Sequence, residues 1–191
     1  MPLFDVLIED TSALPYQVPP AGQHIMTTFG AGMTTNGTFA QVADRLSIAP
    51  FLARATMSVD QASVIVTAGV AGALGRVVLY ASESDGYPAG LLLESGDLDL
   101  AAAATVATAF AVTLQQGVTY WIGMATSSTP ILSTWASSAV PDIQGGTPSA
   151  TARKSVRRTV AYSSAAPSIW GAFNQAEVSA VLPVAIWLRR A

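Results

Sequence analysis

The sequence contains no cysteine and a single histidine, His24. Without cysteine there is no disulfide bond, no thiolate metal site and no cysteine nucleophile. One histidine cannot form a histidine metal cluster, and His24 lies near Pro20 and Gly22 with no recognisable nucleophile beside it. We therefore expect no catalytic residue, no metal and no cofactor, and we predict that the protein is not an enzyme.

Charged side chains are also scarce, at 11% of the residues against 51% hydrophobic ones. The net charge of −3 provides no overall positive field for nucleic acid, and no apolar run reaches the roughly 20 residues of a membrane span. Residues 1–10 lack the basic start of a secretory signal. So little charge suits a surface covered by partners, which predicts a homotrimer or larger symmetric oligomer, without nucleic-acid or membrane partners.

Short segments of alternating apolar residues follow one another from residue 45 onward. Turn residues separate them, and the pattern predicts roughly eight to ten strands at spacings of about 8–12 residues. This pattern is typical of an all-β, antiparallel β-sandwich of the jelly-roll kind. The segments are 45–50, 57–67, 76–81, 91–94, 107–114, 118–125, 158–162 and 184–188. The predicted core includes Val64, Val66, Val78, Tyr80, Leu92, Trp121 and Ile186.

Two segments need separate treatment. At Asp60-Gln61 the alternation changes phase, which predicts a bulge or turn between Met57/Val59 and the following apolar set. The stretch Leu100–Ala109 is rich in alanine, so a helix is the alternative there. Thr and Val interrupt this stretch, and we therefore predict a strand toward its end.

The first forty residues are irregular, since Pro15, Pro19 and Pro20 forbid a regular helix. We predict that residues 1–40 are an N-terminal arm or attachment segment with at most two short strands, and that residues 41–191 form the sandwich. The arm has too little apolar periodicity to fold alone, so we expect a neighbouring subunit to order it.

Aromatic side chains in or beside predicted loops are candidates for stacking on sugar rings. They are Tyr87, Trp135 and Trp170, with Tyr16 in the arm; the alternative is that the tryptophans close the ends of the core. Two loops carry the candidates, 82–88 and 137–151. In the first loop, Glu83, Asp85 and the Gly86 carbonyl have the oxygen ligands that a hard cation takes. We interpret them as a solvated turn, with a cation site as the alternative.

The remaining charged candidates are few. Asp97 and Asp99 stand two apart, hence on one face of a strand, and a solvated face explains them. The basic residues Arg153, Lys154, Arg157 and Arg158 cluster in the sequence. They are candidates for contact with a polyanion or with another subunit.

A series of short motifs resembles a known group of proteins. The motifs are Arg45-Leu46 with Pro50-Phe51, Gly75-Arg76-Val77-Val78-Leu79-Tyr80, Gly86-Tyr87-Pro88 with Leu91-Leu92, and Leu114 with Gly117 and Tyr120-Trp121. In this order they are similar to the β-sandwich modules of tailed-phage fibres, head spikes and related virion surface proteins, which gene transfer agents share. The resemblance covers about residues 45–130 and brings no catalytic residues.

The resemblance implies a structural subunit on the virion surface, assembled in the host cytoplasm. Its partners would be other copies of itself, other virion proteins and host surface polysaccharide. The position could be fibre, spike or capsid decoration. The alternative is a bacterial carbohydrate-binding module or adhesin domain, and a depolymerase is a weaker third reading.

Overall fold

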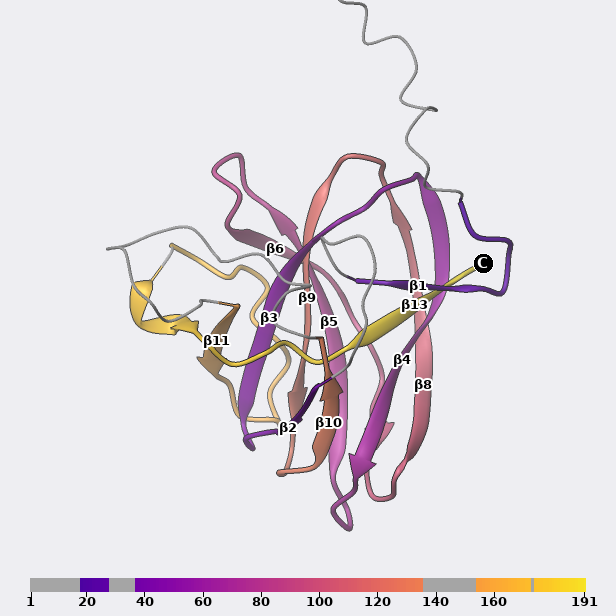
Figure 1. The fold of residues 1–191 in the computed structure, drawn as a ribbon. Coiled ribbons are helices and arrows are strands. Elements are labelled where there is room, and N and C mark those ends of the chain that lie inside the picture. The colour runs from indigo at the N-terminus through magenta and orange to yellow at the C-terminus, as the bar shows by residue number, and fades with distance from the viewer. Residues whose placement is uncertain (1–17, 28–36, 136–153, 173) are drawn as a thin grey trace, which may run out of the picture.

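The computed structural model describes residues 18–27, 37–135, 154–172 and 174–191. These residues form thirteen β-strands and one short 3-10 helix, η3 (Gln175–Glu177), with no α-helix among them (Figure 1). The strands are β1 (His24–Met26), β2 (Gly37–Ala40), β3 (Arg45–Leu52), β4 (Met57–Ala68), β5 (Leu74–Ser82), β6 (Pro88–Glu94), β7 (Leu98–Asp99), β8 (Ala104–Leu114), β9 (Thr119–Thr126), β10 (Ile131–Thr134), β11 (Ser155–Thr159), β12 (Val178–Ser179) and β13 (Ile186–Arg190).

The strands form two antiparallel sheets that pack face to face. In sheet A, the long strand β4 pairs with β8 on one side and with β13 and β10 on the other, and β1 and β2 add outside these. Sheet B has the order β12-β11-β3-β9-β5-β6, with β7 also against β5. The predicted antiparallel β-sandwich is thus confirmed.

A two-stranded ribbon passes from one sheet to the other. Strands β3 and β9 pair in sheet B as far as Leu52 and Thr119. The same two chain segments pair again in sheet A, as β4 and β8, starting from Met57 and Leu114. A ribbon folded across two sheets is the arrangement that a jelly roll uses.

The main core lies between the sheets and contains the inward-facing residues of both. On β4 these are Met57 and Val59 and then, after a register shift at Asp60, Ala62, Val64 and Val66. The shift is a β-bulge, and the extra residue moves the inward positions from odd to even numbers. The sequence prediction of a phase change at Asp60-Gln61 is confirmed.

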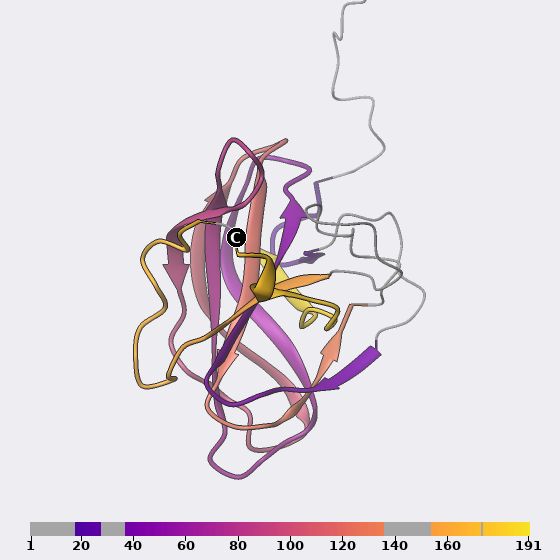
Figure 2. The same cartoon turned by 90° about the vertical axis from the view of Figure 1, so that its left-hand side faces the viewer.

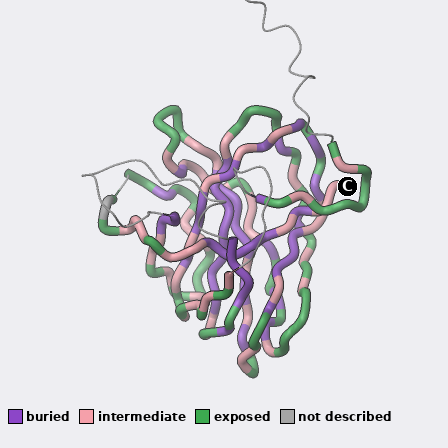
Figure 3. Tube along the Cα trace, viewed as in Figure 1, coloured by how far each residue is buried: buried purple, intermediate pink, exposed green. Residues whose placement is uncertain are grey.

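Sheet B carries a second apolar layer on its outer face. The cover segment, residues 160–172, crosses this face and encloses Leu46, Ile48, Val78, Tyr80, Trp121, Ala125, Val156 and Trp170. Figure 2 shows the cover segment as the orange-yellow chain along the outside of the sheet. Figure 3 shows the centre of the molecule buried (purple). Strand β9 is therefore buried along nearly its whole length.

Hydrogen bonds attach the cover segment to the sheet, and an ion pair between two strands of the sheet holds one of the donors. Arg76 forms an ion pair of 2.7 Å with Glu94 and donates to the carbonyls of Tyr162 and Ser164. The Tyr80 hydroxyl donates to the Pro167 carbonyl at 2.9 Å. These bonds satisfy carbonyl groups of an irregular segment that crosses an apolar surface.

The predicted core is right except at one position. Val64, Val66, Val78, Tyr80, Trp121 and Ile186 are buried, whereas Leu92 is 50% exposed. The cause is a bulge: Leu79 pairs with Leu93 and Tyr80 with Leu91, which leaves Leu92 as the extra residue on β6. A period-two prediction does not detect such an insertion.

Some boundaries also differ from the prediction. The late strand expected at 158–162 lies at Ser155–Thr159, because residues 160–162 already belong to the cover segment. The alanine-rich stretch is a strand from Ala104 onward, so the helix alternative is wrong. Two short strands lie in the predicted arm, β1 and β2, and both are part of sheet A.

Candidate functional site

The hairpin between β5 and β6 projects at one end of the sandwich, as Figure 1 shows. Gly86 has a φ of +87°, a conformation that suits glycine. The Asp85 carboxylate accepts the Tyr87 N–H at 3.0 Å, and Trp121 Nε1 donates to the Gly86 carbonyl at 3.1 Å. Asp85 is exposed and Tyr87 half-buried. The tip is thus a surface feature held in place by a core tryptophan.

The bonds of this hairpin agree with the solvated turn rather than with the alternative of a cation site. One Asp85 oxygen caps the turn, and the Gly86 carbonyl accepts the bond from Trp121 Nε1. Within the described ranges, no three side chains of His, Cys, Asp or Glu gather as metal ligands.

Trp135 and Trp170 are both 1% exposed, so they do not provide exposed platforms for sugar stacking. Trp170 lies in the second layer, edge-on to Tyr80 with ring centroids 5.4 Å apart. Trp135 packs against Trp187 at 4.9 Å and donates from Nε1 to Thr27 Oγ1. The burial of both rings agrees with the packing role that the sequence favoured for the tryptophans, Trp170 in the second layer and Trp135 in a small separate cluster.

The basic residues that cluster in the sequence do not form one patch. Arg153 and the loop 137–151, like Tyr16, lie outside the described residues, and Lys154 is buried. Arg157 and Arg158 are neighbours on a strand, so their side chains leave opposite faces. The structure therefore gives each of these two arginines a different environment.

Arg158 belongs to the second layer. Its guanidinium donates to both oxygens of Glu177, at 2.9 and 3.2 Å, and lies 4.7 Å from the centre of the Trp170 ring. Glu177 also accepts a bond from Trp170 Nε1 at 3.1 Å. Both charges are thus neutralised within the chain, and Arg158 anchors the end of the cover segment.

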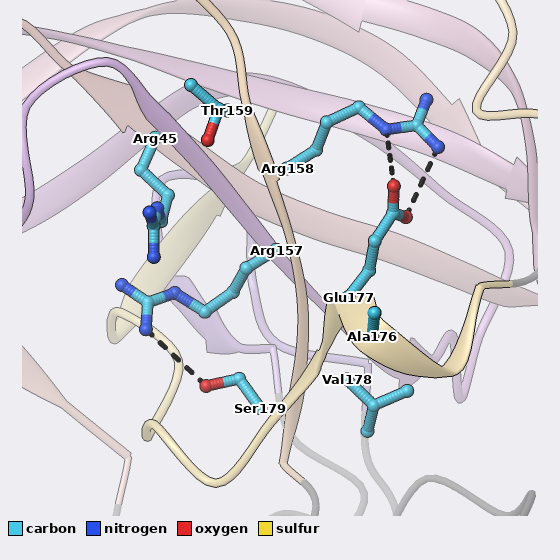
Figure 4. Close-up of a pocket in the computed structure, with 8 residues that line it drawn as sticks. All are labelled: Arg45, Arg157, Arg158, Thr159, Ala176, Glu177, Val178 and Ser179. Atoms are coloured by element: carbon cyan, nitrogen blue, oxygen red, sulfur yellow. Dashed lines mark hydrogen bonds and ion pairs between the residues drawn. The ribbon is translucent and has the colours of Figure 1, made fainter.

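Arg157 lies in a pocket of about 320 Å³ at the β11–β12 edge of sheet B. The lining comes from the start of β3, from β11 and from the segment of η3 and β12: Arg45, Arg157, Arg158, Thr159, Ala176, Glu177, Val178 and Ser179. Figure 4 shows the guanidinium groups of Arg45 and Arg157 close together, while Arg158 extends away toward Glu177. Burial, and then the charge of Arg45, lower the pKa of Arg157.

Arg45 lines this pocket, but the sequence analysis did not propose it as a site residue. It is far from Arg157 in the chain, and the pairing of β3 with β11 places it opposite Thr159, two residues from Arg157 on the same face. Strand pairing between distant segments carries no local sequence signal, so only a correct register prediction would have found it.

The remaining polar candidates are dispersed. His24 is exposed on β1, where it pairs with Arg189 of β13. Asp97 accepts the Tyr162 hydroxyl at 2.7 Å, and Asp99 caps the N–H of Ala101. Each carboxylate thus has a structural role in which it binds a neighbouring segment.

Comparison of the chain with protein-family models, with curated proteins and with solved structures found no match. In the described part of the chain, no helix is long and apolar enough to span a bilayer.

Proposed function

We propose that this chain is a structural subunit of a tailed-phage-like particle, located at its surface as a fibre, spike or capsid decoration. We infer a phage-like particle from the motifs that resemble virion modules. The structural observation that carries the proposal is the free edge of β8, which suits a subunit that assembles.

Strand β8 runs for eleven residues and, among the described residues, pairs with β4 alone. Its sequence, ATVATAFAVTL, has no charge and no proline. Edge strands of proteins that stay monomeric are usually short, or are blocked by lysine, proline or a bulge, because an open edge recruits further strands. This edge carries no lysine or proline, and its pairing is interrupted at one place only, where Phe110 and Ala111 lie opposite Asp60. An open edge of this length favours a strand supplied by a neighbouring copy.

A head-to-tail contact of this kind closes into a ring when the rotation between copies allows it. This agrees with the proposed homotrimer or larger oligomer. In the particle, the β5–β6 hairpin would face the host surface, with Asp85 and Tyr87 at its tip. One such contact is weak, with a Kd of about 1 mM, so many copies together would provide adhesion.

The experiment is to purify particles from the source and to quantify this chain in them by mass spectrometry. A fixed stoichiometry of several copies per particle is expected. Its absence from intact particles would refute the proposal and would favour the carbohydrate-binding module or adhesin domain instead.

The adhesive role has its own test. The substitution Tyr87→Ala should lower adsorption of particles to host cells while the melting temperature stays nearly unchanged, because Tyr87 is half-buried at the tip. The matched control is Leu92→Ala, an exposed residue of the same hairpin. Unchanged adsorption would refute the adhesive role and would favour a purely structural place in the shell.

A further inference from the structure

The pocket at the β11–β12 edge contains more positive than negative charge. Three arginines and one glutamate line it, and the glutamate is bound on both oxygens by Arg158. No carboxylate of the described residues forms an ion pair with Arg45 or Arg157. Partly buried charges are normally paired, because an uncompensated charge is costly to remove from water. Two adjacent cations that no acid of the described residues neutralises therefore need another explanation.

Two buried polar atoms on neighbouring strands beside the pocket have no hydrogen-bond partner among the described residues. They are the Nε of Arg157 and the Oγ of Ser47. Arg157 and Ser47 are directly opposite in the pairing of β11 with β3. Buried polar atoms are nearly always bonded to protein, water or a ligand. An acceptor brought into the pocket would satisfy at least the Arg157 N–H.

The chemistry of the lining indicates the kind of acceptor. Guanidinium groups bind carboxylate and phosphate oxygens through two parallel N–H donors, which adds geometric specificity to the charge. The hydroxyl of Ser179, 3.4 Å from Arg157 Nη1, and that of Thr159 are further donors at the rim. A pocket of about 320 Å³ lies at the small end of the range for ligand sites, so it suits one small group.

We propose that Arg45 and Arg157 bind one oxyanion group in this pocket, either the carboxylate of an acidic sugar or an inorganic phosphate. The anion lies between the two guanidinium groups and offsets their mutual repulsion. Arg158 does not take part, because Glu177 already neutralises it. The inference concerns the purified chain, and it stands or fails independently of the role in a particle.

The test is a titration of the full chain followed by NMR at the arginine Nε–H signals, with D-glucuronate, sodium phosphate and D-glucose as separate probes. The Arg157 signal should shift with at least one of the two anions, with a Kd on the order of 1 mM, and the Arg158 signal should shift little. Glucose, which lacks the charge, should shift neither. Binding of glucuronate alone identifies the sugar acid as the source, and binding of phosphate alone identifies the free ion.

Substitutions then test which residues form the anion site. Arg45→Ala and Arg157→Ala should each weaken binding at least about tenfold, and Arg157→Lys, which keeps the charge but loses the planar fork, should weaken it less. The matched control is Arg189→Ala, which removes one positive charge from sheet A and should change the Kd less than about twofold. Arg157→Ala should melt no lower than the wild type, because it removes a desolvated and repelled charge.

Three results would overturn the proposal. They are no binding of either anion to the wild type, an equal response to glucose, and equal weakening by Arg189→Ala and Arg157→Ala. If Arg157→Ala fails to fold, Arg45→Ala and the wild-type Nε–H shifts decide the question.

Discussion

The two sheets of the sandwich differ in how much of their surface the chain itself covers. Sheet B is buried on both faces, by sheet A on one side and by the cover segment on the other. Sheet A is buried along one face and only locally on the other, where Trp135 packs against Trp187. Among the described residues, its strand β8 is largely exposed along an edge that pairs with no further strand. Both candidate binding features, the hairpin tip and the arginine pocket, belong to sheet B. Sheet B thus carries both candidate binding features, and the open edge of sheet A is the surface that we propose for assembly.

The sequences of the strands reflect this difference. Strand β9 (TYWIGMAT) is a continuous apolar run, as expected for a strand buried on both faces. Strand β8 alternates Thr and Ala outside with Val, Phe and Leu inside. The strand with two covered faces is thus apolar between its terminal threonines, whereas the strand with one covered face alternates.

The largest effect should come from a charge in the second layer. Val78→Asp places a carboxylate under the cover segment, where Val78 is fully buried, and should lower the free energy of unfolding by about 4 kcal/mol or more. The matched control, Ser58→Asp on the exposed face of β4, should cost about 1 kcal/mol or less. Urea unfolding at one chain concentration measures both, and equal losses would contradict the comparison.

A smaller loss is expected when the cover segment loses its anchor. Trp170→Ala removes a ring that is 1% exposed and packs on Tyr80, at a cost of about 3 kcal/mol. Trp170→Phe keeps most of the apolar contact and loses the bond to Glu177, so it should cost less. Hydrogen exchange should accelerate in residues 160–172 and not in β8. Acceleration in both regions would mean that the second layer is not a separate unit.

The smallest effect should arise on sheet A, at the exposed pair of Asp60 and Arg189. Hydrogen bonds from Arg189, at 2.9 Å to each Asp60 oxygen, lower the pKa of this carboxyl. A lowered pKa gives a stabilisation that is present above the unfolded value of about 3.9 and is lost as the pH falls below it. Asp60→Asn should therefore melt slightly below the wild type near neutral pH and equal it in acid. A difference that persists in acid would assign the effect to the bulge geometry.

Much of the fold could be predicted because the alternation is local. The bulge at Asp60 changes the phase within one strand, and the residues on either side reveal it. The bulge that exposes Leu92 could not be found in this way, because the three consecutive leucines 91–93 contain no polar position to mark the phase. The burial of Trp170 could not be decided from the alternation for a related reason: it depends on an irregular segment that follows no period.

The candidate site was less predictable than the fold. A run of basic residues suggested one patch, but strand geometry sends Arg157 and Arg158 to opposite faces, and Glu177 neutralises only one of them. The partner of Arg157 is Arg45, which only the long-range pairing of β3 and β11 brings near. Of the three arginines that line the pocket, sequence reasoning therefore named Arg157 and Arg158 and missed Arg45.

The central claim, assembly through the edge of β8, is tested most directly by the mass of the chain in solution. Light scattering at micromolar concentration should give at least three chains of 19.7 kDa for the wild type. The double substitution Ala107→Lys with Ala111→Lys places charges on the exposed side of β8 and should reduce the mass to one chain. Ser84→Lys with Ser163→Lys, which adds the same charge on sheet B and its cover segment, should leave the oligomer intact. A wild-type mass of 19.7 kDa, or an oligomer that survives the β8 lysines, would contradict the account.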